Sequence, residues 1–199
     1  TQTLAPYWNA FVRLAFFSVV AILLFKVRGS LIAMTKMAMR DSLTALSNSR
    51  AFQMQYDDIR RNAHKSSHGF AVVVIDLDGF KKINDSLGHS KGDDVLVAFA
   101  EILKKATRST DIVARMGGDE FVIIIPCESI EETGRITEEI KNIFGKPWFL
   151  KDADYYCTMS MGIVEFPEEG DSVQDLIKKA DIAMYDAKKS GKNRIARYT

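Results

Sequence analysis

Cysteine, histidine and net charge are all scarce in this chain of 199 residues. It holds 2 cysteines, Cys127 and Cys157, and 3 histidines, with no CxxC spacing and no cluster of histidines. This scarcity argues against a structural zinc site or a disulfide framework, and we expect both thiols to be buried and reduced. The formal net charge of only +1 gives no bulk field that would attract nucleic acid, so we expect no nucleic-acid partner.

A long apolar run stands near the start of the chain. Residues 14–25 carry no charge, and residues 7–27 together would form a helix of roughly 30 Å. That length matches the hydrocarbon core of a bilayer, with Tyr7 and Trp8 suited to one interface. Four basic residues follow the other end, which the positive-inside rule makes cytoplasmic: Lys26, Arg28, Lys36 and Arg40. The alternative is a buried or dimer-forming helix of a soluble protein. A signal peptide fits poorly, because no small-residue cleavage site follows.

Apolar positions at helical spacing continue beyond this run. Three residues follow Val27 at the spacing of a coiled coil: Leu31, Met34 and Ala38. The pattern is short, so it predicts only a brief helical stalk. We therefore expect residues 1–40 to form a transmembrane helix with its stalk, and residues 41–199 to form one globular domain.

The globular part alternates strand and helix patterns. Residues 69–75 are almost wholly apolar, which is typical of a central strand covered on both faces. Further strands are expected at 112–114, 121–125, 155–164 and 195–198. Amphipathic helices are expected at 93–105, 130–144 and 173–188, and a further helix is expected to start near Lys81. This order predicts an α+β fold, an α/β sandwich in which helices flank a mixed central sheet of about five strands.

Carboxylates gather at the ends of two predicted strands. Asp76 and Asp78 close the first strand, and Asp119 and Glu120 follow the glycine pair at 117–118. Two adjacent glycines predict a tight hairpin turn, because glycine accepts the positive φ that such turns require. Acids in a turn are ordinarily only solvated. Two such clusters at strand ends instead favour a site for a hard divalent cation and phosphate, since these ions prefer oxygen ligands.

Four segments of the globular part, in this order, resemble the GGDEF domain family of diguanylate cyclases. They are DSLTALSNSRAF at 41–52, DLDGFKKINDSLGHSKGDD at 76–94, GGDEF at 117–121 and AKKSGKNR at 187–194. The resemblance covers nearly everything after residue 40. It implies the family's nucleotidyl-cyclase, palm-like fold and its reaction, in which two GTP molecules condense to cyclic di-GMP and two pyrophosphates.

The same resemblance implies a role for each matching residue. The metal ligands for Mg²⁺ or Mn²⁺ would be Asp76, the Leu77 carbonyl, Asp119 and Glu120. Asp119 and Glu120 would also be the catalytic residues, with Glu120 needed for turnover as base or as metal ligand. Eight residues would contact the substrate: Phe80, Lys81, Asn84, Asp93, Gly117, Gly118, Lys188 and Lys192. Among these, Asn84 and Asp93 would pair with guanine. For the lysines at 188 and 192, the alternative is a favourable charge at the end of a helix.

Arg108 and Asp111 form an RxxD motif shortly before the glycine pair. In the family, this motif at this offset is an inhibitory site for the product. Arginine suits such a site because its planar fork pairs with phosphates and stacks on guanine. On its own the motif is a common surface pair.

Some positions depart from the family's pattern. In the opening segment, Ala45 replaces a usual glycine, Ser47 a proline, and Asn48-Ser49 an Asn-Arg pair. Gly79 stands where a larger residue is frequent, and Lys192 where arginine is frequent. None of these changes removes a predicted metal ligand.

The resemblance further implies a homodimer, because one domain holds one GTP and two must face each other. Together with the apolar helix, it predicts an enzyme of the bacterial inner membrane with its catalytic domain in the cytoplasm. The product, cyclic di-GMP, would also be its inhibitor. The alternative is a catalytically silent GGDEF-type domain that binds cyclic di-GMP or GTP, or that serves only for interaction.

Overall fold

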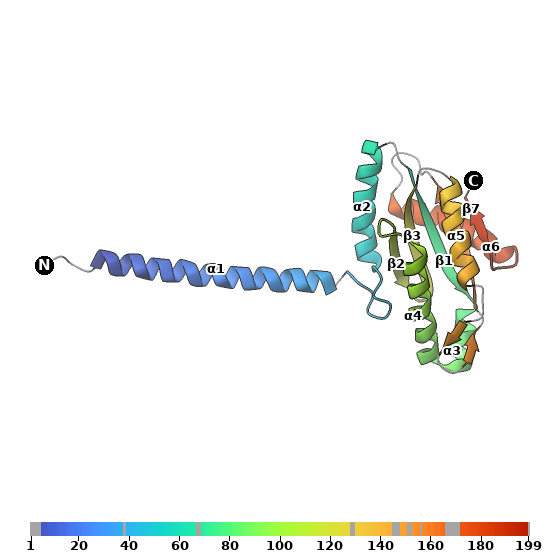
Figure 1. The fold of residues 1–199 in the computed structure, drawn as a ribbon, viewed down its shortest axis with the longest axis horizontal. Coiled ribbons are helices and arrows are strands. Elements are labelled where there is room, and N and C mark those ends of the chain that lie inside the picture. The colour runs from blue at the N-terminus through green and yellow to red at the C-terminus, as the bar shows by residue number, and fades with distance from the viewer. Residues whose placement is uncertain are drawn as a thin grey trace. The chain divides into compact units, whose positions relative to one another are not determined.

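The computed structural model describes residues 5–37, 39–66, 69–127, 130–144, 148–150, 153–155, 157–165 and 172–198. The chain divides into two units, Thr1–Met39 and Arg40–Thr199. The first unit contains a single long helix, α1, over Ala5–Met37 (Figure 1). Within it, Ala10–Arg28 has a mean hydropathy of 2.2 and contains no buried residue, and its length and composition would allow it to cross a membrane. The side chains of the predicted stalk from residue 29 to 38 lie outside the described residues.

The second unit is built on a mixed sheet of five strands in the order β2-β3-β1-β6-β7. The central strand β1, Gly69–Asp78, pairs antiparallel with β3, Glu120–Cys127, and with β6, Thr158–Glu165. At the edges, β2 (Ile112–Gly117) is antiparallel to β3, and β7 (Ile195–Arg197) is parallel to β6. The predicted α+β architecture is therefore confirmed.

Five helices accompany this sheet: α2 at Ser49–Ser66, α3 at Phe80–Leu87, α4 at His89–Ala106, α5 at Ile130–Phe144 and α6 at Val173–Lys189. Two short strands, β4 at Trp148–Leu150 and β5 at Ala153–Tyr155, form a separate hairpin. Residue 155 therefore belongs to β5, whereas the sequence placed it in one strand with residues 158–164. Helix α4 also begins earlier than predicted, directly after Gly88, whose φ of 84° ends α3.

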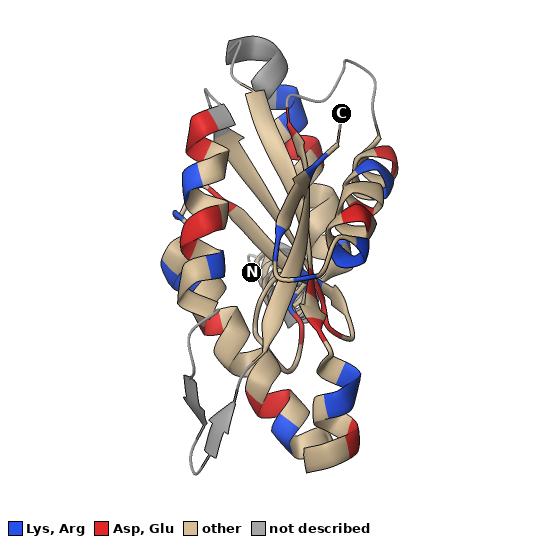
Figure 2. Cartoon of the chain, turned by 90° about the vertical axis from the view of Figure 1, so that its right-hand side faces the viewer, with Lys and Arg blue, Asp and Glu red and all other residues tan. Residues whose placement is uncertain are grey.

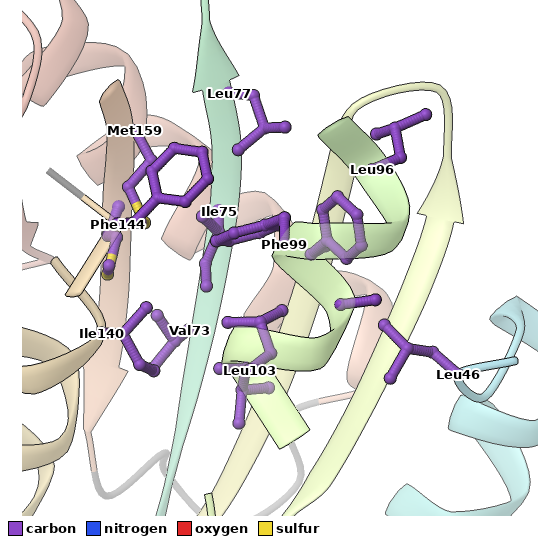
Figure 3. Packing of buried hydrophobic residues seen from close by; sticks show 14 of the residues in the cluster. Leu46, Val73, Ile75, Leu77, Leu96, Phe99, Leu103, Ile140, Phe144 and Met159 are labelled. Carbon is purple, nitrogen blue, oxygen red and sulfur yellow. The ribbon is translucent and has the colours of Figure 1, made fainter. Parts of the chain in front are cut away.

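The two faces of the sheet pack against different helices. Side chains of α3, α4 and α5 cover one face, where Phe99 contacts Phe121 and Phe144 with ring centroids 4.8 and 4.6 Å apart (Figure 3). Side chains of α2 and α6 cover the other face. Because side chains alternate along a strand, Val73, Ile75 and Leu77 face α4 and α5, whereas Val72 and Val74 face α2 and α6. By the same alternation, Asp76 and Asp78 lie on the α6 side.

The thiol expectation holds for Cys157, which is buried and free. Burial, with smaller contributions from nearby carboxylates, raises the pKa of this thiol to about 12, so it stays protonated at neutral pH. The side chain of Cys127 lies outside the described residues.

Candidate functional site

The turn between β2 and β3 has the backbone that the glycine pair predicted. Gly117 has a φ of 152° and Gly118 a φ of 51°, both within the region that favours glycine. Strand pairing resumes between Gly117 and Glu120, so Gly118 and Asp119 form the tip of a tight hairpin. The turn thus presents the Asp119 carboxylate between two exposed neighbours, Gly118 and Glu120.

Asp76, Glu120 and Lys188 come together at this end of the sheet. In the register of β1 and β3, Asp76 lies directly opposite Glu120. The Lys188 ammonium, from the last turn of α6, lies 2.8 Å from Asp76 Oδ1. The Asp76 side chain is only 15% exposed, so this ion pair is partly shielded from water. Figure 2 shows acidic residues gathered where the central strands meet their turns.

This end of the sheet carries an excess of negative charge. Partial burial, together with the charges of Asp119 and Asp78, raises the pKa of Asp76 against the opposing effect of Lys188. Partial burial also raises the pKa of Glu120, followed by repulsion from Asp181, Asp76 and Asp119. Among the described residues, Lys188 is the cation paired with Asp76, and its one positive charge does not balance these carboxylates. A cation placed among them would therefore be attracted, because it would relieve their mutual repulsion.

The donor set fits a magnesium ion that is shared with a nucleotide. Within the described part of the chain, no three acidic, histidine or cysteine side chains converge as a ready-made metal cage. Mg²⁺ is commonly held by one or two carboxylates together with substrate phosphates and water, and this arrangement needs no such cage. Asp76 and Asp119 can supply the carboxylates. Leu77 has a hydrocarbon side chain that is buried in the core, so its backbone carbonyl is the only oxygen that this residue could contribute.

The residues predicted to read guanine lie on α3 and α4. Asn84 packs against Gly92, where an added Cβ would come within 1.9 Å of Asn84 Oδ1. Among the described residues, this buried oxygen has no hydrogen-bond partner. A buried polar atom without a partner is costly, so Asn84 is suited to a ligand that donates a hydrogen bond. Asp93 is exposed on α4, one turn after the helix begins at His89, and the buried Phe80 begins α3.

The predicted phosphate contacts lie on two backbone turns. Gly79 has a φ of 77° and precedes α3, so the left-handed conformation explains why glycine stands there. Lys81 is exposed in the first turn of this helix, whose free amides favour an anion. Lys192 lies in the turn after α6 with a φ of 62° and is exposed.

The RxxD residues form a separate turn between α4 and β2. The backbone N–H of Arg108 donates to Asp111 Oδ2 at 2.8 Å. Burial raises the pKa of Asp111, although this hydrogen bond and the Arg108 charge oppose the shift. The Arg108 guanidinium lies 2.5 Å from the carboxylate of Glu132 on α5. This arginine therefore already has an acidic partner.

Sequence reasoning missed several residues that shape the site. Asp181 repels Glu120 more strongly than either Asp76 or Asp119 does. It precedes Lys188 by about two helical turns, so both lie on one side of α6, a spacing that could have signalled it. Arg115 was also missed, although it stands directly before the turn.

Arg115 joins the turn at Gly118 to the opening segment at residues 41–52. Its Nε and Nη2 donate to the Gly118 carbonyl at 3.0 and 2.8 Å, and its Nη1 donates to Asp41 Oδ1 at 3.0 Å. Burial alone would raise the pKa of Asp41. The hydrogen bonds from Thr44 and Arg115 outweigh burial and lower it, so Asp41 is held as a carboxylate. The opening segment thereby fixes the carbonyl that precedes Asp119.

Ala45, which replaces a usual glycine, keeps a backbone suited to glycine. Its φ is 56°, a left-handed conformation that strains a residue with a Cβ. The Ala45 carbonyl accepts from Arg40 at 2.6 Å, and its N–H donates to the Asp41 carbonyl at 2.9 Å. These bonds hold the turn despite the substitution.

Known proteins are similar to this chain in sequence and in fold. The family described as "Diguanylate cyclase, GGDEF domain" matches residues 38–194. The chain is 36% identical over 172 residues to the response regulator PleD of Caulobacter vibrioides, which covers 85% of this chain and 38% of that protein. It is 39% identical over 163 residues to the diguanylate cyclase TpbB of Pseudomonas aeruginosa, covering 80% of this chain and 38% of that protein.

A solved structure extends the likeness to three dimensions. The coiled coil and GGDEF domain of DgcB from Caulobacter crescentus, in complex with c-di-GMP, matches with a TM-score of 0.82 at 27% identity, covering 92% of this chain and 97% of that one. The chain spans less than half the length of the two curated relatives. The sequence match, the fold and the acids at the strand ends all indicate the same family. The chain belongs to the GGDEF domain family of diguanylate cyclases.

Proposed function

We propose that this protein condenses two GTP molecules into cyclic di-GMP and releases two pyrophosphates. The observation that carries the proposal is the register that sets Glu120 opposite Asp76, beside the Asp119 turn and Lys188. The 3′-hydroxyl of each GTP would attack the α-phosphate of the other. Each attack forms one phosphorus–oxygen bond and breaks the bond to pyrophosphate.

The chain's own residues would bind and orient the two reactants. Lys81, Lys188 and Lys192 would hold the triphosphate, and the exposed Gly117–Gly118 backbone would let it approach the turn. The side chains of Asn84 and Asp93 would form hydrogen bonds with the edge of the guanine base. Adenine presents a different donor pattern, and a mismatch that leaves buried polar groups unpaired is rejected steeply.

Asp76, Asp119 and the Leu77 carbonyl would hold Mg²⁺ or Mn²⁺, which, when bound, neutralises phosphate oxygens. Glu120 is the carboxylate to which we assign turnover. Its raised pKa brings it closer to neutral pH, where a carboxylate becomes a better proton acceptor. The proton would come from the attacking 3′-hydroxyl.

The same reasoning supports a homodimer anchored in a membrane. One domain offers one nucleotide site, so two copies related by a two-fold axis would bring the two GTP molecules together. Helix α1 has the length and apolar composition to anchor the chain. We place the protein in the bacterial inner membrane with the GGDEF domain in the cytoplasm. Arg108 and Asp111 would bind cyclic di-GMP as an inhibitory product.

The test is synthesis of cyclic di-GMP by the full chain supplied with GTP and Mg²⁺. We expect product from the wild type and a loss of at least a hundredfold in Glu120→Gln, the order found when a general acid–base group is removed. Glu101→Gln is the matched control, because Glu101 is an exposed residue of α4 paired only locally with Lys104. Equal activity of Glu120→Gln and wild type would refute the role of Glu120. No product from wild type would refute the activity.

A further inference from the structure

Asp78 ends β1 and accepts three hydrogen bonds from two other segments of the chain. The Thr158 hydroxyl donates to its Oδ2 and the Ser160 hydroxyl to its Oδ1, both at 2.8 Å. The backbone N–H of Asn193 donates to Oδ2 at 3.0 Å. Thr158 and Ser160 lie on β6 and Asn193 follows α6, so one carboxylate joins the sheet to the turn after α6. Both of its oxygens are engaged within the protein.

The turn that Asp78 holds has an unusual backbone. Three consecutive residues have positive φ: 118° at Gly191, 62° at Lys192 and 49° at Asn193. A left-handed conformation is strained at Lys192, whose Cβ crowds the backbone, and is tolerated better at Asn193, because asparagine adopts it more readily. Such strain persists only where surrounding contacts determine the backbone.

Hydrogen bonds on both sides fix this turn. The Lys192 N–H donates to the Ala187 carbonyl at 3.2 Å, and the Arg194 carbonyl accepts from Met161 at 2.9 Å. Between them, the bond from Asn193 to Asp78 is a side-chain contact that ties the tip of the turn to β1. The Lys192 side chain is exposed, whereas hydrogen bonds hold its own N–H and the backbone of the two residues that follow it.

We propose that Asp78 is a positioning residue that holds the Lys192 turn against the end of β1 and thereby sets the affinity of the site for a nucleoside triphosphate. The inference rests on the proposed function for the identity of the ligand. Asp78 acts through Lys192 and does not touch the nucleotide. It differs in this from Asp76 on the same face of β1, whose Oδ1 pairs with the Lys188 ammonium.

The geometry also separates Asp78 from a metal ligand. A carboxylate that accepts from two hydroxyls and an amide would have to give up these bonds to bind a cation. Its removal would instead release Asn193, and the strained turn would relax toward ordinary φ values. Lys192 would then move away from the position it holds beside the strand end, and small displacements of this kind are costly to binding.

The experiment measures binding of two probes to the full chain in detergent by calorimetry, with Mg²⁺ present. The probes are 3′-deoxy-GTP, which lacks the attacking hydroxyl and is not consumed, and 3′-deoxyguanosine, which lacks the phosphates. Asp78→Ala is expected to weaken binding of the triphosphate about tenfold, as loss of an orienting contact does elsewhere. Binding of the nucleoside is expected to change less than about twofold, since Asn84 and Asp93 lie on other elements.

A double-mutant cycle assigns the effect to Lys192. If Asp78 acts through this lysine, Lys192→Ala adds little to the loss already caused by Asp78→Ala. Additive losses would overturn the proposal, as would equal loss of both probes in Asp78→Ala. The matched control is Asp175→Asn, which removes one charge from the far end of α6 and is expected to leave both affinities unchanged.

Two milder variants keep the test decisive if Asp78→Ala does not fold. Thr158→Val and Ser160→Ala, combined, remove both hydroxyls that orient Asp78 while the carboxylate remains. We expect a smaller loss, about threefold, for the triphosphate alone, and unchanged triphosphate binding would overturn the proposal. Because neither probe reacts, these results stand apart from the turnover assay. Failure of wild type to make cyclic di-GMP would refute the activity without deciding the role of Asp78.

Discussion

The turn before β2 and the turn after it both hold partly buried acids, yet their charges are balanced differently. In the first, Asp111 accepts from the Arg108 N–H, and the Arg108 side chain pairs with Glu132. In the second, Asp119 and Glu120 stand with Asp76 around a single ammonium from α6. One strand of six residues separates the two turns.

This difference indicates what each turn is prepared to bind. The turn at residues 117–120 carries unbalanced negative charge, so it is suited to a metal ion and to the nucleotide that we propose the metal accompanies. The Arg108 turn is already paired, so an anionic ligand must displace Glu132 before it gains the arginine. Binding at the first turn relieves repulsion, whereas binding at the second exchanges one ion pair for another.

Arg115→Ala should have the largest effect, and it should disturb the turn at residues 117–120 but not the Arg108 turn. The change removes the donors to Gly118 and Asp41, so the Asp119 turn loses its connection to the opening segment. We expect cyclic di-GMP synthesis to fall about tenfold or more, because misplacement of a reacting group is costly. Calorimetric binding of cyclic di-GMP at the Arg108 turn should stay unchanged.

The control for this variant is Arg135→Ala, which removes an exposed arginine of α5 paired with Glu139. It should leave synthesis unchanged. A parallel loss of synthesis and of cyclic di-GMP binding in Arg115→Ala would mean that the whole domain is disturbed, and the local interpretation would be wrong.

Glu132→Gln should change product inhibition at the Arg108 turn. Without its charge, Glu132 no longer competes for Arg108, and product inhibition should strengthen. An exposed ion pair contributes about 0.2–1 kcal/mol, which corresponds to an inhibition constant lower by about 1.5- to 5-fold. The measurement is the initial rate of synthesis against added cyclic di-GMP.

Glu139→Gln removes the same charge from the same helix but from a pair with Arg135, and it should leave inhibition as in the wild type. Weaker inhibition in Glu132→Gln would contradict the competition. It would indicate that Glu132 orients Arg108 for the product.

The two turns also show what the sequence can predict. Periodicity identified α5 and α6, because each buries one regular set of apolar side chains, and a continuous apolar run identified β1, which is buried on both faces. It predicted no helix at α2, where charged residues dilute the apolar pattern and Phe52 and Tyr56 carry the burial. It also joined β5 to β6, since short strands lack a full period.

The candidate site divides in the same way. Acids next to glycine turns could be found from local spacing, which is why Asp76, Asp119 and Glu120 were predicted together. Partners that folding brings together from distant segments could not be found in this way, because no local sequence pattern identifies them. The bond of Asp78 to Asn193 and that of Arg115 to Asp41 depend on strand order and on the turn after α6. Such contacts position a site without appearing in its motif.

The smallest expected effect concerns the pH dependence of stability at the Arg108 turn. Burial raises the pKa of Asp111 above its ordinary value of 3.8, so the folded state binds this proton more tightly than the unfolded state. Its contribution to stability is present below that ordinary value and is lost as pH rises through the folded pKa. Asp111→Asn lacks this loss, so its denaturation midpoint relative to wild type should rise between about pH 4 and pH 7.

Asp175 supplies a control of opposite sign at the start of α6. Hydrogen bonds from Ser172 lower the pKa of Asp175, so its contribution appears as pH rises and is lost as pH falls through the folded pKa. The midpoint of Asp175→Asn relative to wild type should therefore fall as pH rises toward the ordinary value of 3.8, and it should stay level above that value. If both variants shifted in the same direction, a general charge effect would explain the data, and the burial of Asp111 would not govern its titration. Slopes of opposite sign would instead show that burial of the Asp111 carboxylate in the Arg108 turn raises its pKa.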